Sequence, residues 1–239
     1  YMFDFPTQHW HYALEIFADC MRNCTFKQEL LNSELKAVIQ ELKMYKDNYS
    51  HVVIEELMSA IFAGHPYSYP IIGYKHDLWG FDSKKLKDFY RRYYVPNNAI
   101  LTVVGDVVPD EVFKHAEQYL GVIPSGTVEN LTDTYLEKDF VAKSVTLYRD
   151  IKQPFITCAF VVPGALYKVD YLLEVLNLLV GSGRGSRLYK KLVEELGFAT
   201  EVSSFCYDFL EHGLFLIRVQ PKDSQKITEI LTQIKLEMQ

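Results

Sequence analysis

The sequence predicts an α+β protein with two similar domains, and three observations support this fold class. Segments with apolar residues at helical spacing alternate with short apolar runs typical of buried strands. A strand, a turn containing Pro and Asp, and an amphipathic helix follow one another in residues 101–120 and again in residues 215–234. Between these two copies, residues 122–143 carry Pro, Gly, Ser and Thr with little periodicity, which is typical of a linker.

The first predicted domain, residues 1–125, is mainly helical. Its first six residues alternate between apolar and polar types up to Pro6, as a half-buried strand does. Helices are expected where apolar residues recur every three or four positions, where Asp82 or Ser83 caps a first turn, and where Pro109 fits a first turn. In chain order we expect a strand at 1–6, helices from Thr7, at 27–46 and 48–64, a turn-rich connection at 63–74, a helix at 82–94, a strand at 99–107 and a helix at 109–121.

The second predicted domain, residues 144–239, follows a linker placed at 126–143. The segment "GSGRGSR" at 181–187 matches neither of the common phosphate-binding glycine patterns, so we interpret it as a tight turn between helices capped by Ser186. In chain order we expect strands at 144–150 and 155–164, helices at 168–180 and 186–196, a β-rich stretch to Val219, and a terminal helix with Ile227, Ile230, Leu231 and Ile234 on one side.

Composition limits the class of protein. With 239 residues, 49% hydrophobic residues and a net charge of −6, the chain is typical of a soluble globular protein without the basic surface that nucleic acid requires. No apolar run reaches the roughly 20 residues that span a bilayer, and no membrane association is expected. The sequence starts within a predicted strand and stops within a predicted helix, so we expect a piece of a longer protein.

Two acids on the predicted helix at 27–46 are candidate functional residues. Glu34 and Glu41 are seven residues apart, so their side chains leave a helix within about 20° of each other and roughly 10 Å apart along its axis. The ordinary interpretation is a solvated helix face, because Lys36, Lys43 and Lys46 lie nearby. On spacing alone the two acids share a face without sharing one ion.

The histidines do not supply an obvious metal site. His9 and His11 lie two positions apart and therefore face opposite ways on a helix. His51 and Glu55 have a spacing that suits either two ligands or an ordinary helical polar pair, and we favour the pair. The segment "DFLEH" at 208–212 lies between two strand-like segments, so we expect a hairpin there. The remaining histidines considered, His65, His76 and His115, are isolated in the sequence.

Two long segments resemble the pitrilysin/insulinase family of zinc metallopeptidases, which includes the mitochondrial processing peptidases. They are "NSELKAVIQELKMYKDN" and "HPYSYPIIGYKHDLWGFDSKKLKDFYRRYYVPNNAILTVVGDV", and "GSGRGSRLYKKLVEELGFA" is similar to part of the family's second domain. The resemblance implies two similar α+β domains, each a mainly antiparallel sheet with helices packed on it. It also implies half of a clam-shell chamber that encloses a peptide substrate.

The resemblance assigns roles to the two acids. In the family an inverted motif, His-x-x-Glu-His, supplies two zinc ligands and the general base, and a Glu on a later helix is the third protein ligand. Glu41 matches that ligand, and Glu34 matches the acid that orients ligands by hydrogen bonding. The motif itself occurs nowhere in these 239 residues. We therefore expect zinc in the complete protein, no zinc in this chain alone, and no peptide hydrolysis by this chain alone.

A second departure from the family pattern indicates which half the chain resembles. Domains that hold substrate from the half without zinc carry an Arg and a Tyr seven residues apart, where this sequence has Val193 and Thr200. The chain thus resembles the zinc-bearing half, whose partner is a second half of one longer chain or a second subunit. Two function classes remain open: part of a zinc endopeptidase, or a non-catalytic scaffold or partner subunit. The compartment is not indicated by the sequence.

Overall fold

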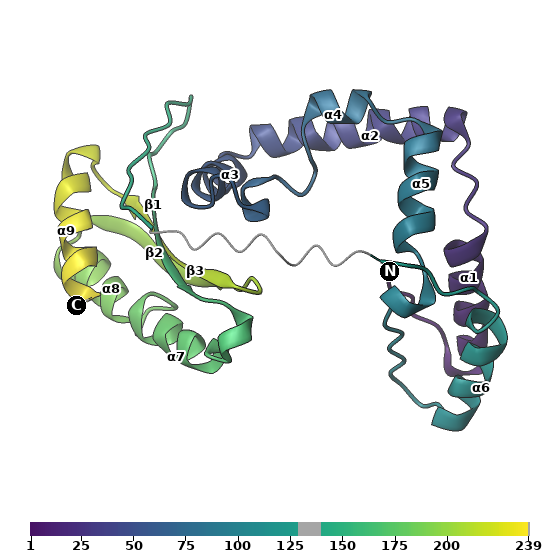
Figure 1. The fold of residues 1–239 in the computed structure, drawn as a ribbon. Coiled ribbons are helices and arrows are strands. Elements are labelled where there is room, and N and C mark those ends of the chain that lie inside the picture. Colours follow the sequence, from purple (N-terminus) through teal and green to yellow (C-terminus); the bar gives the residue numbers. More distant parts are fainter. Residues whose placement is uncertain (129–139, 239) are drawn as a thin grey trace. The chain divides into compact units, whose positions relative to one another are not determined.

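A computed structural model describes residues 1–128 and 140–238 of the chain (Figure 1). The described residues belong to two compact units. Unit 1 comprises Tyr1–Asn48 and Gly64–Glu137, and unit 2 comprises Tyr49–Ala63 and Lys138–Gln239. Most of the linker predicted at 126–143 lies outside the described residues, so the predicted domain boundary stays a prediction.

The described part of unit 1 is helical. A 3₁₀ turn at Thr7–His9 leads into the first helix, and further 3₁₀ turns lie at Pro66–Ser68 and Pro96–Asn98. The four longer helices were predicted from the sequence, whereas the short α4 was not. The helices are α1 (Trp10–Arg22), α2 (Gln28–Asp47), α4 (Lys75–Trp79), α5 (Ser83–Tyr93) and α6 (Pro109–Leu120).

Local capping signals define two of these helix starts. Asp82 precedes α5, and its carboxylate accepts a hydrogen bond of 2.7 Å from the backbone N–H of Lys85, as predicted for a cap. Pro109 is the first residue of α6, where its missing N–H has no cost. Helix α1 packs on α6, and α2 packs on α4. The most buried side chains of unit 1 include Leu14, Leu42 and Val112.

The two strands expected in unit 1 are absent from its described residues, which corrects that part of the sequence analysis. Residues 1–6 and 99–107 form no regular secondary structure, and the side chain of Ile100 is 96% exposed. A strand exists only where its backbone N–H and C=O groups pair with another strand, and no described segment pairs with these two. Both segments do have the apolar pattern of a strand, but the pattern alone does not supply a second strand for pairing.

Unit 2 contains an antiparallel sheet, which confirms the predicted α+β class. Its strands are β1 (Ile156–Pro163), β2 (Ala199–Tyr207) and β3 (His212–Pro221), in the order β1-β3-β2. A short hairpin joins β2 to β3, and β1 pairs with the other edge of β3. The prediction of a strand at 144–150 was wrong, because this segment pairs with no other strand within the described residues.

Helices cover one face of this sheet and form the main core. Side chains alternate between the two faces of a strand, so Phe215, Ile217 and Val219 of β3 all point toward the helices. There they meet buried residues such as Leu192 and Ile230, and all five are 0% exposed.

The helical elements of unit 2 are α3 (Tyr49–Ile61), α7 (Asp170–Val180), α8 (Arg187–Tyr189), a π-helical turn (Lys190–Glu195), α9 (Ile227–Glu237) and 3₁₀ turns at Ala165–Tyr167 and Ser224–Lys226.

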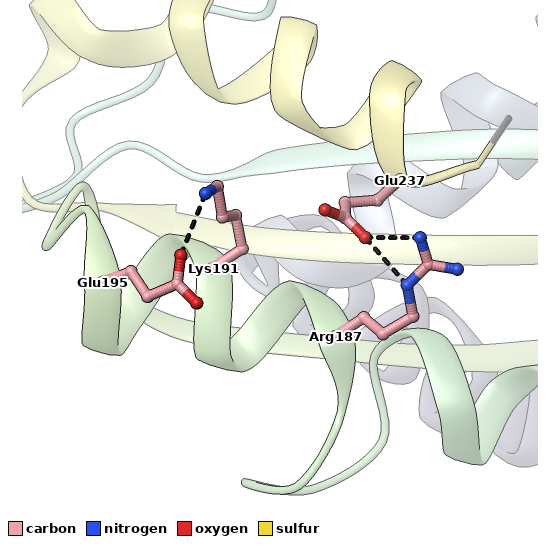
Figure 2. A network of polar contacts seen from close by, with 4 residues as sticks. All are labelled: Arg187, Lys191, Glu195 and Glu237. Carbon is pink, nitrogen blue, oxygen red and sulfur yellow. Dashed lines mark hydrogen bonds and ion pairs between the residues drawn. The ribbon is translucent and has the colours of Figure 1, made fainter.

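One polar contact joins α8 to α9, and a second lies within the helical turn that follows α8 (Figure 2). Two guanidinium nitrogens of Arg187, at the start of α8, donate to one carboxylate oxygen of Glu237 at 2.8 and 2.9 Å. One turn further on, Lys191 pairs with Glu195 at 2.9 Å. Arg187 is 61% exposed, so solvent screens its pair, which aligns α8 with the end of α9 more than it stabilises the fold.

The glycine-rich segment 181–187 is a tight turn between α7 and α8, as predicted. Ser186 directly precedes α8, but its hydroxyl donates to the carbonyl of Gly183 at 2.8 Å and does not cap the helix. Gly181 lies against β2, where an added Cβ would be 2.6 Å from the hydroxyl oxygen of Ser204. The glycine at 181 therefore permits close packing of helix end and sheet.

Candidate functional site: the acidic face of helix α2

Helix α2 carries both acids predicted to be functional, and its sequence explains which way they face. Its apolar stripe buries Leu31 and Leu42, which are 9% and 6% exposed. Glu34 and Glu41 lie outside this stripe, and both are exposed. The start of the helix is held by Gln28, whose amide oxygen accepts a hydrogen bond of 3.0 Å from the backbone N–H of Ser83.

Tyr45 positions the carboxylate of Glu41. The phenol, one turn along the same helix, donates a hydrogen bond of 2.7 Å to Oε1 of Glu41. This hydrogen bond, together with the negative charge of Glu41, raises the pKa of Tyr45 above its usual value, so the phenol stays protonated as a donor. Sequence analysis missed Tyr45, although the i, i+4 spacing of Glu and Tyr on a helix was a usable signal.

The second carboxylate oxygen of Glu41 has no partner among residues 1–128 and 140–238. Lys43 and Lys46 lie nearby in the sequence, but neither forms an ion pair with Glu41. Glu34 likewise has neither a hydrogen bond nor an ion pair to a described residue. Both acids thus present carboxylates on the surface of α2, one held by a phenol and one free.

The other candidate groups have ordinary partners. Nε2 of His51 lies 3.1 Å from Oε1 of Glu55, the helical polar pair that was favoured. His212 is the first residue of β3 and directly follows the hairpin loop, as expected for the "DFLEH" segment, and its ring stacks on Phe62. Nδ1 of His65 accepts a hydrogen bond of 3.1 Å from the backbone N–H of Tyr67.

One histidine described above as isolated in the sequence has aromatic neighbours in the fold. His115 on α6 lies beside Trp10 and His11 of α1, with ring centroids 5.1 and 6.2 Å apart. Nδ1 of its ring also lies 2.8 Å from the backbone carbonyl of Glu111. Only the packing of α1 on α6 brings these rings together, so sequence spacing gave no signal for it.

The fit of zinc to this chain can be judged from its donor groups. A zinc site in a peptidase needs three protein ligands with His, Cys or carboxylate side chains. Within the residues that the structure describes, no three such side chains gather. Glu41 is one donor of the required type, and the described residues do not form a zinc site by themselves.

Comparison with known proteins identifies the family. The profile described as "Insulinase (Peptidase family M16)" matches residues 1–75, and that described as "Peptidase M16 inactive domain" matches residues 80–239. The chain therefore belongs to peptidase family M16, the pitrilysin/insulinase family. The resemblance stated from the sequence is thereby confirmed.

Individual relatives agree with this assignment. The uncharacterized zinc protease YmxG of Bacillus subtilis is 28% identical over 211 residues, which are 88% of this chain and 50% of YmxG. The mitochondrial-processing peptidase subunit alpha of Solanum tuberosum is 27% identical over 232 residues, which are 91% and 45% of the two chains. The crystal structure of a protease from Helicobacter pylori shares the fold, with a TM-score of 0.85, 23% identity and coverage of 96% of this chain and 56% of that one.

The chain spans about half the length of the curated relatives it matches. Neither family profile marks a particular residue, so the roles of Glu34 and Glu41 rest on the resemblance of the α2 sequence to the family. No helix within the described residues combines the length and apolar character that a membrane-spanning segment needs.

Proposed function

We propose that this chain is part of a zinc metalloendopeptidase of family M16, in which Glu41 is one protein ligand of the zinc ion. The observation that carries the proposal is the state of Glu41: an exposed carboxylate with one oxygen held by Tyr45 and the other without a partner among the described residues. A ligand must offer a deprotonated oxygen with a defined direction, and the phenol of Tyr45 provides that direction.

The remaining zinc ligands and the general base would come from a His-x-x-Glu-His motif, which these 239 residues do not contain. The proposal therefore requires further residues of the same polypeptide for this motif, and a second half, either in one longer chain or in a second subunit, to enclose the substrate. Relatives named zinc proteases, each about twice the length matched, support a second half in one longer chain, and a relative named as a subunit supports a second subunit. The substrate would be a peptide or an unfolded segment enclosed between two halves.

Glu34 is proposed as a supporting acid. It lies on the same side of α2 as Glu41, about 10 Å along the axis, too far to bind the same ion directly but close enough to hydrogen-bond a histidine ligand. Its carboxylate has no partner in the described part of the chain, so it is available for this role.

The test uses the protein as isolated from its source, compared with variants of the same polypeptide. We expect one zinc ion per molecule by elemental analysis and hydrolysis of a quenched fluorescent peptide that a chelator abolishes. Glu41→Gln should remove most of the zinc and the activity. Glu34→Gln should lower activity by about 10- to 100-fold with smaller zinc loss. Glu29→Gln, an exposed acid on the same helix, is the matched control and should change neither.

Retention of zinc and activity by the Glu41→Gln protein would overturn the ligand assignment. If wild-type protein is folded but holds no zinc and cleaves no peptide, the enzyme proposal fails as a whole. Tyr45→Phe adds a finer test, because loss of the phenol should weaken zinc binding by about 10-fold while leaving the α2 helix intact.

A second candidate function is a non-catalytic scaffold or partner subunit of the same fold. It is favoured by the match of residues 80–239 to the profile described as the inactive domain, together with the missing motif. In that case the protein should form a stable complex with another polypeptide, and Glu41→Gln should leave both assembly and any zinc content of the complex unchanged.

A further inference from the structure

An open pocket of about 350 Å³ lies on the sheet of unit 2, on the face opposite to helices α7, α8 and α9. Its residues share this face because Ser203 pairs with Arg218, and Glu201 with Gln220, across the β2 and β3 strands. Their neighbours along each strand, such as Val202 and Val219, belong to the core instead. The pocket is lined by Glu201, Ser203, Phe205, Arg218 and Gln220.

The cation in this pocket has no acidic partner. The guanidinium carbon of Arg218 lies 4.2 Å from the ring centroid of Phe155, and this stacking limits the movement of the side chain. No described carboxylate lies within ion-pairing distance of Arg218, although Glu201 lines the same pocket. A half-buried arginine that stacks on a ring and lacks a carboxylate presents its planar donors to a ligand.

Neutral donors and one aromatic ring surround the guanidinium. Ser203 lies directly across the strand pair from Arg218, so its hydroxyl is available on the same face. The side-chain nitrogen of Gln220 donates to the side-chain oxygen of Gln153 at 2.8 Å, which leaves the second N–H of Gln220 as a further donor. Phe205 forms an apolar wall beside these groups. One cation, several neutral donors and an apolar wall suit a carboxylate attached to an apolar group.

Glu201 restricts the charge of the ligand. One arginine and one glutamate make the pocket neutral overall, so a ligand with two or more negative charges, such as a phosphate ester, is disfavoured. A single carboxylate needs only the planar fork of one guanidinium. We propose that this pocket binds the carboxylate of a peptide, with Arg218 as its anchor and Phe205 in contact with the adjoining side chain.

Such a carboxylate has two sources in a peptide: the C-terminus, or an Asp or Glu side chain. This site lies entirely in unit 2 and involves none of the residues of helix α2, so it does not rest on the proposed zinc site. A test in the presence of a chelator therefore separates failure of this proposal from failure of the proposed peptidase.

The first arm needs no variant. N-acetyl-Ala-Phe acid, N-acetyl-Ala-Phe amide and N-acetyl-Glu-Phe amide are titrated into the isotopically labelled protein, and the amide signals of residues 201–205 and 218–220 are followed by NMR. We expect saturable shifts with the acid and none with the first amide if the C-terminus is recognised. Shifts with the glutamyl amide would identify the side chain as the source. Equal binding of all three peptides, or of none, would overturn the proposal.

The second arm uses variants whose fold is checked by the same spectra. Arg218→Gln should weaken binding by at least about tenfold, and Arg218→Lys should restore part of it, since the charge remains but the fork is lost. Arg184→Gln, which removes an exposed arginine from the turn before α8, is the matched control and should bind as the wild type does. Unchanged affinity in a folded Arg218→Gln protein would contradict the assignment.

Glu201→Gln should not weaken peptide binding, in contrast to Arg218→Gln. If the ligand is recognised through its carboxylate, removal of the nearby negative charge should leave binding equal or strengthen it about twofold, most clearly at low salt. A marked loss of affinity would mean that Glu201 recognises a cationic group, and the carboxylate assignment would then be wrong.

Discussion

The two units of the chain differ in how they bury their apolar residues. In unit 2 the central strand β3 pairs on both edges, and four of its consecutive residues, 214–217, are at most 1% exposed. In unit 1 the segment 99–107 has a similar apolar pattern but no pairing partner, and Val104 is 91% exposed. An apolar run therefore becomes a buried strand only where other segments satisfy its backbone groups.

The difference should appear as a difference in local stability. Both tryptophans of the chain, Trp10 and Trp79, lie in unit 1, so tryptophan fluorescence reports on that unit alone. Hydrogen exchange at the backbone amides of β3 reports on unit 2. The two probes separate the units, because a chain with two units need not unfold in one transition.

Truncating the centre of the unit 2 core should cause the greatest loss of stability. Phe215→Ala removes a ring that is 0% exposed and should lower the free energy of unfolding of the sheet by about 3–5 kcal/mol, because it leaves a cavity. Hydrogen exchange at β3 should accelerate accordingly, while the tryptophan transition in urea stays in place. Phe113→Ala on α6 of unit 1, where the ring is 70% exposed, is the matched control and should change stability by less than about 0.5 kcal/mol. Similar losses of stability in both variants would show that the two units do not differ in how they bury these rings.

The same contrast explains how much of the fold could be predicted from the sequence. The hydrogen bonds of a helix lie within its own segment, so apolar spacing and caps such as Asp82 were sufficient to predict α1, α2, α5 and α6. The hairpin of β2 and β3 was predictable because its two strands are adjacent in the sequence. The failures at 1–6, 99–107 and 144–150 are segments that find no pairing partner among the described residues, whereas β1, which was also predicted, finds one in the distant strand β3.

The candidate sites divide in the same way. The exposure of Glu34 and Glu41 follows from the apolar stripe of one helix, and the contact of Tyr45 with Glu41 follows from its spacing. The pocket around Arg218 could not be predicted, because it depends on the register that places Ser203 opposite Arg218 and Glu201 opposite Gln220. A shift of one residue in that register would turn the polar side chains into the core.

An intermediate effect is expected where α7 ends against the sheet. In a Gly181→Ala protein the new methyl group would lie 2.6 Å from the hydroxyl oxygen and 2.7 Å from Cβ of Ser204, so the helix end must move away from β2. We expect a loss of about 1–3 kcal/mol, measured by hydrogen exchange at β2 and β3. Gly185→Ala, in the same turn, meets no atom within 4 Å and should be neutral or slightly stabilising. If the Gly181→Ala protein is as stable as the wild type, the close packing of unit 2 ends before this turn.

The cysteines provide a further contrast between the two units, and their effect on stability is small and absent at neutral pH. Cys20 and Cys24 of unit 1 are exposed, whereas burial beneath the helices raises the pKa of Cys158 in β1 to about 11. Since the thiolate is the reactive form, iodoacetamide at pH 8 should modify Cys20 and Cys24 well before Cys158, as mass spectrometry of the digested protein would show.

The raised pKa of Cys158 also fixes the direction of a pH effect on stability. Between the ordinary thiol pKa of 9.0 and about 11, the unfolded chain has lost a proton that the folded chain retains. The unfolded state is therefore favoured increasingly as pH rises through this window, and the thiol contributes no such dependence below it. Cys158→Ala should reduce the alkaline loss of stability detected by hydrogen exchange at β1 and β3, whereas Cys24→Ala should leave it unchanged. The opposite outcome would be rapid alkylation of Cys158 and a Cys158→Ala protein that loses stability with rising pH as steeply as the wild type. It would show that the core of unit 2 opens as readily as unit 1. The contrast between the units would then lie in their backbone pairing alone.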